Sequence, residues 1–115
     1  MKAETLAKRI ITGLDEMKAI DIRSIDVRDL TSVTDVMIIA SGRSDRQVRA
    51  LAQRAVEIAT KAGVRVLGTE GEREGQWILV DLGDVIVHLM HPTARAYYQL
   101  EKLWADGAQQ ARLSS

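Results

Sequence analysis

Apolar residues recur at the spacing of an amphipathic helix in two parts of the chain. Residues 3–18 carry the first pattern, in which apolar positions lie three or four apart: Ala3, Leu6, Ile10, Leu14 and Met17. The second pattern runs from Val48 to Ala62 and follows a capping box formed by Ser44 and Gln47. Gly63 then supplies a helix-ending position, so we expect a helix between Ser44 and Gly63.

Apolar segments of strand length separate and follow these helices. Residues 36–40 are apolar throughout, which predicts a central strand buried on both faces. Weaker patterns predict four more strands, at residues 22–27, 64–68, 77–82 and 85–90. Residues 69–75 are predicted as a loop, and residues 81–84 as the turn of a hairpin. Pro92 suits the first position of a last helix, with His91 as its N-cap.

This order of elements predicts an α/β fold, α-β-β-α-β-β-β-α, in which helices flank a mixed β-sheet. A length of 115 residues suits one domain. We expect that domain to span residues 1–106, with residues 107–115 as a flexible C-terminal tail because few apolar residues anchor them.

Composition narrows the class of protein. Sixteen basic residues balance sixteen acidic ones, which argues against a protein that binds nucleic acid mainly through net positive charge. The chain has no cysteine, which excludes disulfides, thiol nucleophiles and zinc–thiolate sites. The longest apolar runs are about five residues, too short to cross a membrane, and the N-terminus lacks a signal-peptide core. We therefore expect a cytoplasmic protein.

Few residues could support catalysis. Asp81 and Asp84 flank a turn, with His88 and His91 close behind, but a metal site needs three convergent ligands and His91 lies beyond the strand end. We interpret the two aspartates as turn-forming residues and expect no metal and no cofactor.

Gly42, Arg43 and Ser44 lie between a buried strand and a helix N-terminus, where anions bind. The chain has no phosphate-loop motif and no carboxylate pair for magnesium on the next strand. A nucleotide-binding or nucleotidyltransferase-like enzyme using Gly42 and Ser44 is therefore the alternative function rather than the preferred one. Four arginines on or before this helix are predicted to be solvated surface, because no aromatic residues interleave with them: Arg43, Arg46, Arg49 and Arg54.

The few aromatic residues all lie in the last third of the chain. Trp77 begins a strand beside a charged loop, and Leu82 is placed at the tip of a tight turn, with little protein to pack against. Trp and Tyr are enriched at protein interfaces. We therefore predict an exposed patch of Trp77, Leu82 and Tyr98 that binds another protein, with a homodimer that shares this patch as a further alternative.

Three segments of the chain resemble the Iojap-like proteins. Residues 30–48 contain Thr34-Asp35 and the run Ser41-Gly42-Arg43-Ser44-Asp45-Arg46, residues 71–88 contain the pattern W-x-x-x-D-x-GD-x-x-VH, and the third segment, residues 98–104, ends in LEKLW. The resemblance extends from about residue 4 to residue 105. It departs from the family where Gly42-Arg43-Ser44 replaces a common GTS and Gln47 replaces a common histidine.

The resemblance implies a function without chemistry. Family members bind the large ribosomal subunit through ribosomal protein uL14 and sterically block the small subunit, which represses translation. It implies a nucleotidyltransferase-like fold without catalytic carboxylates, and it implies that Trp77, Leu82 and Tyr98 bind the partner. Asp81 and Asp84 are expected to add contacts to basic partner surface, ribosomal RNA to be a minor contact, and the protein to be a monomer or homodimer.

Overall fold

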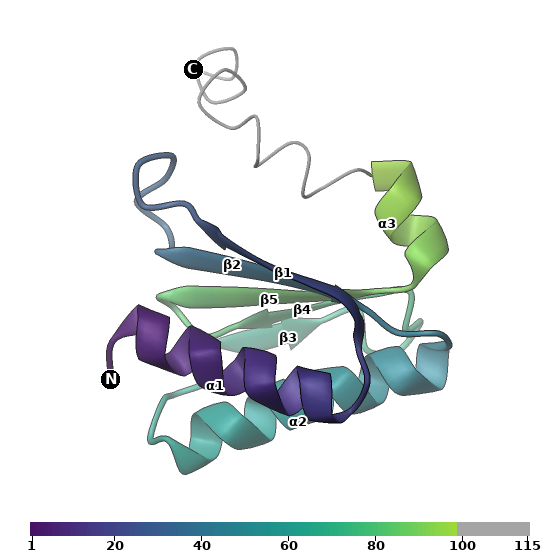
Figure 1. Cartoon of the computed structure of the whole chain (residues 1–115), viewed down its shortest axis with the longest axis horizontal. Coiled ribbons are helices and arrows are strands. Elements are labelled where there is room, and N and C mark those ends of the chain that lie inside the picture. The colour runs from purple at the N-terminus through teal and green to yellow at the C-terminus, as the bar shows by residue number, and fades with distance from the viewer. Residues whose placement is uncertain (99–115) are drawn as a thin grey trace.

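The computed structural model describes residues 1–98, which form the α/β arrangement that the sequence predicts. The elements are α1 (Ala3–Glu16), β1 (Ile20–Asp26), β2 (Val36–Ser41), α2 (Asp45–Lys61), β3 (Gly68–Glu70), β4 (Trp77–Asp81), β5 (Val85–Met90) and α3 (Pro92–Tyr98) (Figure 1). The tail predicted at residues 107–115 lies outside the described residues. No helix of residues 1–98 is both long and apolar enough to cross a membrane.

The predicted boundaries are wrong at one strand. Residues 64–67 do not form the expected strand, and β3 begins only at Gly68. It takes in the first two residues of the loop predicted at residues 69–75, whereas residues 71–75 form a loop as predicted. Each residue of β3 is exposed, so no buried apolar face defines it. Its position is set by antiparallel pairing with β4, in which Gly68 lies opposite Asp81.

The five strands form one mixed sheet in the order β1-β2-β5-β4-β3. Only β2 and β5 are parallel, and the other neighbouring pairs are antiparallel. Every residue of β2 is buried, which confirms the prediction of a central strand. The β4–β5 hairpin is also confirmed, with Asp81 opposite Ile86 at its closed end.

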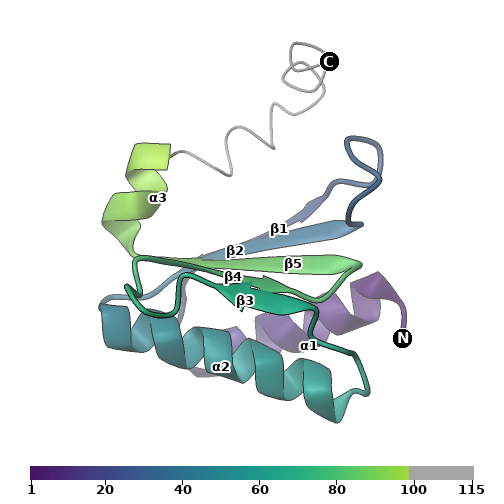
Figure 2. The same ribbon diagram turned by 180° about the vertical axis from the view of Figure 1, so that it is seen from behind.

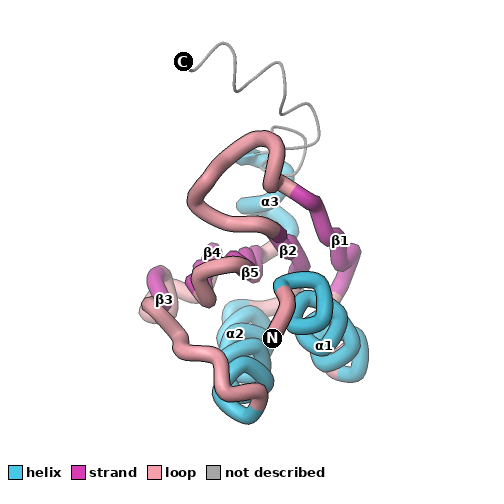
Figure 3. The backbone as a smooth tube through the Cα atoms, turned by 90° about the vertical axis from the view of Figure 1, so that its left-hand side faces the viewer, coloured by secondary structure: helices cyan, strands magenta, loops and turns pink. Residues whose placement is uncertain are grey.

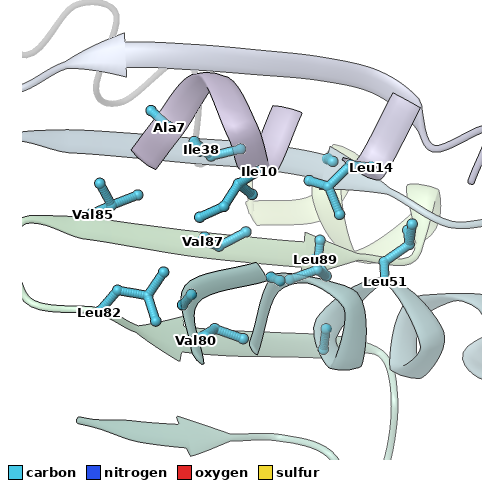
Figure 4. Packing of buried hydrophobic residues seen from close by; sticks show 14 of the residues in the cluster. Ala7, Ile10, Leu14, Ile38, Leu51, Val80, Leu82, Val85, Val87 and Leu89 are labelled. Atoms are coloured by element: carbon cyan, nitrogen blue, oxygen red, sulfur yellow. The ribbon is translucent and has the colours of Figure 1, made fainter. Parts of the chain in front are cut away.

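Both long helices cover the same face of the sheet. Figures 1 and 2 show α1 and α2 on one side and α3 on the other, and Figure 3 shows α1 and α2 lying side by side beneath the strands. The main core forms between these helices and the sheet, and its fully buried side chains include Ile10, Leu14, Ile38, Leu51, Val80, Val85, Val87 and Leu89 (Figure 4). A smaller cluster of Val27, Met37, Ile39 and Met90 lies on the second face, where Ala94 of α3 packs against it.

The start of α2 is capped as predicted, with one difference. Ser44 Oγ accepts a hydrogen bond from the Gln47 backbone N–H at 3.1 Å. The Gln47 side chain reaches back to the backbone N–H of Arg43 at 2.6 Å, one residue earlier than in a standard capping box. At the other end Gly63 has φ +76°, the left-handed conformation that ends a helix.

Candidate protein-binding surface

The side chains of β4 divide between the two faces of the sheet. Ile78 and Val80 point into the main core, whereas Trp77, Leu79 and Asp81 are half-buried on the second face. This alternation follows from the two-residue period of a strand. Asp81 pairs with Ile86 of β5, which is also half-buried and shares its face. We call these four residues, Trp77, Leu79, Asp81 and Ile86, the β4 strip.

A buried histidine orients the tryptophan of the β4 strip. Trp77 Nε1–H donates to Nδ1 of His88 at 2.9 Å, and the two ring centroids are 5.8 Å apart. His88 is only 5% exposed, and burial lowers its pKa from 6.5 to about 4. The imidazole is therefore neutral at physiological pH, so Nδ1 has a lone pair free to accept the indole proton. This bond holds the Trp77 ring in place.

The expectation that Leu82 is exposed is wrong. Leu82 is only 5% exposed and belongs to the main core, where Figure 4 shows it pointing in among Val80 and Val85. Every second side chain of β4 points into the core, as Ile78 and Val80 do. Leu82 is the next position in this series, directly after the strand. The Leu82 backbone N–H also donates to the Val85 carbonyl at 2.9 Å and closes the turn. Leu82 therefore supports the turn from within.

The two aspartates of the turn are placed differently. The half-buried Asp81 accepts a hydrogen bond at Oδ1 from the Gly83 N–H at 2.9 Å, where Gly83 has φ +85°. Asp84 is exposed, and its backbone carbonyl accepts from Asp35 and Val36 at 2.9 and 3.1 Å. The prediction of turn-forming residues is confirmed. Asp81 and Trp77 mark the two ends of β4, roughly 13 Å apart at strand spacing.

The predicted contact at Tyr98 concerns a side chain outside the described part of the structure, although its backbone ends α3. The start of that helix is fixed to the sheet by Arg95, which is buried. Arg95 Nη1 donates to Ser41 Oγ at 3.0 Å, and Nη2 lies 3.6 Å from a carboxylate oxygen of Asp21. His91 caps the helix as predicted, because the Thr93 N–H donates to its Nδ1 at 3.3 Å.

Sequence reasoning missed His88 and Arg95 as positioning residues. The sequence indicates only a candidate metal ligand at His88. Its register opposite Leu79, on the face that Trp77 shares, places it beneath the strip. The sequence contains a signal for this position. Side chains alternate between the faces of a strand, so counting from Trp77 indicates which hairpin residues share its face. Arg95 carries no comparable signal, since its partners Ser41 and Asp21 are distant in sequence.

In the loop of Gly42, Arg43 and Ser44, the alternative nucleotide site, polar groups form hydrogen bonds with other residues of the protein. The Arg43 N–H and the Ser44 hydroxyl are bonded to Gln47, and Arg43 Nη1 donates to the Lys18 carbonyl at 3.1 Å. The backbone of Val48 would lie only 2.9 Å from a Cβ added at Gly42. Within residues 1–98 no group of three or more acidic or histidine side chains is arranged to hold a metal ion.

Three of the four arginines near α2 contact different parts of the fold. Arg43 contacts the end of α1, whereas Arg49 turns to the loop before β4 and donates to the carbonyls of Glu72 and Arg73 at 2.8 and 2.7 Å. Arg54 pairs with Glu57 at 2.7 Å on the side of α2 that faces α1.

Comparisons with known proteins agree with this fold. The model of a family described as "Ribosomal silencing factor during starvation" matches residues 1–115. The ribosomal silencing factor of Haemophilus influenzae is 48% identical over 100 residues, which cover 87% of this chain and 98% of that protein. The chloroplastic Iojap protein of Zea mays is 32% identical over 102 residues, which cover 89% of this chain and 44% of that protein.

A crystal structure of a Chromobacterium violaceum protein has the same fold. It superposes with a TM-score of 0.89 at 44% identity, over 91% of this chain and 88% of that one. The Iojap-like resemblance is therefore confirmed over most of the chain, by sequence and by structure. Together with the full-length match to the family model, these likenesses show that the chain belongs to the ribosomal silencing factor family.

Proposed function

We propose that this protein binds the large ribosomal subunit through ribosomal protein uL14 and sterically blocks joining of the small subunit. The observation that carries the proposal is the β4 strip, in which a half-buried tryptophan is held by a hydrogen bond beside half-buried Leu79 and Ile86. Family membership supplies the ribosome as the partner. The action is non-catalytic and cytoplasmic, and the protein acts as a monomer or homodimer.

The β4 strip has the features of a binding hot spot. Tryptophan is enriched among residues whose truncation costs the most binding energy, and a ring already fixed in the free protein loses less entropy on binding. His88 fixes Trp77 in this way. Tyr98 is proposed to extend the surface along α3.

Acidic groups at the far end of the strip suit a basic partner. The carboxylates of Asp81 and Asp84 lie at the β4–β5 turn, and Asp84 is exposed. Rim charges of this kind steer association and set orientation more than they add affinity. Leu82 contributes to this surface by supporting the turn from the core, rather than by touching the partner.

Replacing Trp77 with alanine is expected to weaken binding to the large subunit by about 2 kcal/mol or more, roughly 30-fold, as hot-spot truncations do. The measurement is co-sedimentation of the full chain with separated large and small subunits. Wild type should sediment with the large subunit alone, and the variant should remain mostly in the supernatant.

A matched control is Val56→Ala, which truncates a half-buried apolar side chain on α2, on the opposite face. It should bind like wild type. Trp77→Phe keeps an aromatic ring but loses the bond to His88, and an intermediate affinity is expected. If folded Trp77→Ala sediments as well as wild type, the proposed surface is wrong. Sedimentation of the wild type with neither subunit would refute the function itself.

A further inference from the structure

A second surface lies on the opposite side of the molecule, between the two long helices. A hollow of about 370 Å³ lies on the surface where α1 and α2 meet, and it is lined in part by Lys8, Arg9, Gly13, Glu16, Arg54, Ile58 and Lys61. We call it the α1–α2 groove. It does not include any residue of the β4 strip, which is on the other face of the sheet.

Close approach of the helices at Gly13 forms the floor of the groove. A Cβ added at Gly13 would overlap Cδ1 of Ile58 and would lie 3.5 Å from Nε of Arg54. Because glycine has no side chain, Ile58 and Arg54 lie across α1 at this point. The long cationic side chains on both helices then form the walls.

The groove is positively charged, although the chain as a whole is neutral. Among the described residues, four cations and Glu16 line it, and Glu57 lies next to two of these cations. Counting both carboxylates leaves a charge of +2 (four minus two), against a net charge of 0 for the chain. Glu57 is shared, at 2.7 Å from Arg54 and 3.5 Å from Lys61. It therefore neutralises only part of the charge of α2.

The cations of α1 are available to a ligand. Lys8 and Arg9 are exposed, and neither has a hydrogen-bond or ion-pair partner within the described part of the chain. Glu4 lies one turn before Lys8 but pairs instead with Arg28 at 2.6 Å. An anion that enters the groove can therefore replace the water around Lys8 and Arg9 with direct contacts.

The spacing of the cations favours an extended anion over a small one. Arg54 and Lys61 are seven residues apart on α2, which corresponds to about 10 Å along a helix. Lys8 and Arg9 lie across the groove on α1. A single phosphate cannot contact both ends of such a row, whereas successive phosphates of a nucleic acid strand can.

We infer that the α1–α2 groove binds the phosphate backbone of an RNA strand, independently of sequence, through Lys8, Arg9, Arg54 and Lys61. Phosphate contacts of this kind position a protein on nucleic acid without reading bases. None of the described residues that line the groove is an aromatic residue on which bases could stack, which agrees with backbone binding. This inference is independent of the β4 strip, since it concerns the opposite face.

The test is fluorescence anisotropy with a labelled single-stranded oligouridylate, using the full chain. Four phosphate contacts predict a slope of about −2.8 in a plot of log K against log salt, or about a 50-fold loss from about 50 to about 200 mM salt. The double variant Lys8→Gln, Arg9→Gln should bind about tenfold more weakly at low salt, with a slope nearer −1.4. Lys61→Gln, on the other wall, should also weaken binding.

The control is Arg46→Gln, which removes one exposed cation from the far end of α2 and should change affinity less than twofold. All these residues are on the surface, and circular dichroism checks that the variants fold. Absence of binding at low salt would overturn the inference, as would an equal loss in Arg46→Gln. Stronger competition by inorganic phosphate than by potassium chloride at equal ionic strength would identify a small-anion site and also overturn it.

Discussion

Leu82→Ala is expected to destabilise the fold by about 3 kcal/mol, because truncation of a buried leucine loses transfer free energy and leaves a cavity. Leu82 is 5% exposed and packs in the main core near Val80 and Val85 (Figure 4). The measurement is the free energy of unfolding from urea titration, followed by circular dichroism. Ribosome binding should then fall only to the extent that the variant is unfolded.

The chain provides a matched control for this prediction. Leu67 is 60% exposed, and its Cδ1 would lie 3.6 Å from a Cβ added at Gly83 in the same turn. Leu67→Ala should change the free energy of unfolding by less than about 0.5 kcal/mol, as surface substitutions do. A Leu82→Ala variant as stable as wild type that no longer binds the large subunit would contradict the core assignment and restore Leu82 as a contact.

The free energy of unfolding should decrease as pH falls below 6.5, in part because of His88. Its pKa is about 4 in the folded protein and 6.5 in the unfolded chain, so the unfolded state binds the proton more readily between these values. The stabilisation is complete above pH 6.5 and is lost as the pH falls to about 4. A difference of this size corresponds to roughly 3 kcal/mol.

Carboxylates also titrate in this range, so the test compares two proteins. His88→Asn can still accept the Trp77 proton but does not titrate. Between pH 7 and pH 4, wild type should lose about 3 kcal/mol more than His88→Asn. The tryptophan fluorescence of wild type should change over the same interval more than that of His88→Asn, as the hydrogen bond from Trp77 breaks. Parallel stability curves for the two proteins would show that His88 is not buried as a neutral group.

The main elements could be predicted because their apolar patterns coincide with what is buried. Residues 36–40 are apolar throughout and form a strand buried along its whole length. Ser44 and Gln47 mark a helix start with groups that bond locally. Both features depend on residues that are close together in the chain, so they can be recognised from the sequence alone.

The errors arose where distant partners decide the structure. β3 consists of Gly68, Thr69 and Glu70, which have no apolar alternation and form a strand only by pairing with β4. The position of Leu82 at a turn predicts exposure, whereas alternation from Ile78 predicts that it faces inward, as the structure has it. The predicted contact residues Trp77, Asp81 and Asp84 lie along one hairpin, but the bond from Trp77 to His88 required the register between strands.

The parallel pairing of β2 with β5 has a consequence for synthesis of the protein. Val36 pairs with Val85, 49 positions later in the chain (85 minus 36). A ribosome makes the chain from its N-terminus, so β2 cannot pair with β5 until β5 has left the exit tunnel. Contacts this distant in sequence also slow folding. A protein of the ribosomal silencing factor family thus completes its core only after β5 has been made, and until then the apolar surface of β2 is available to chaperones.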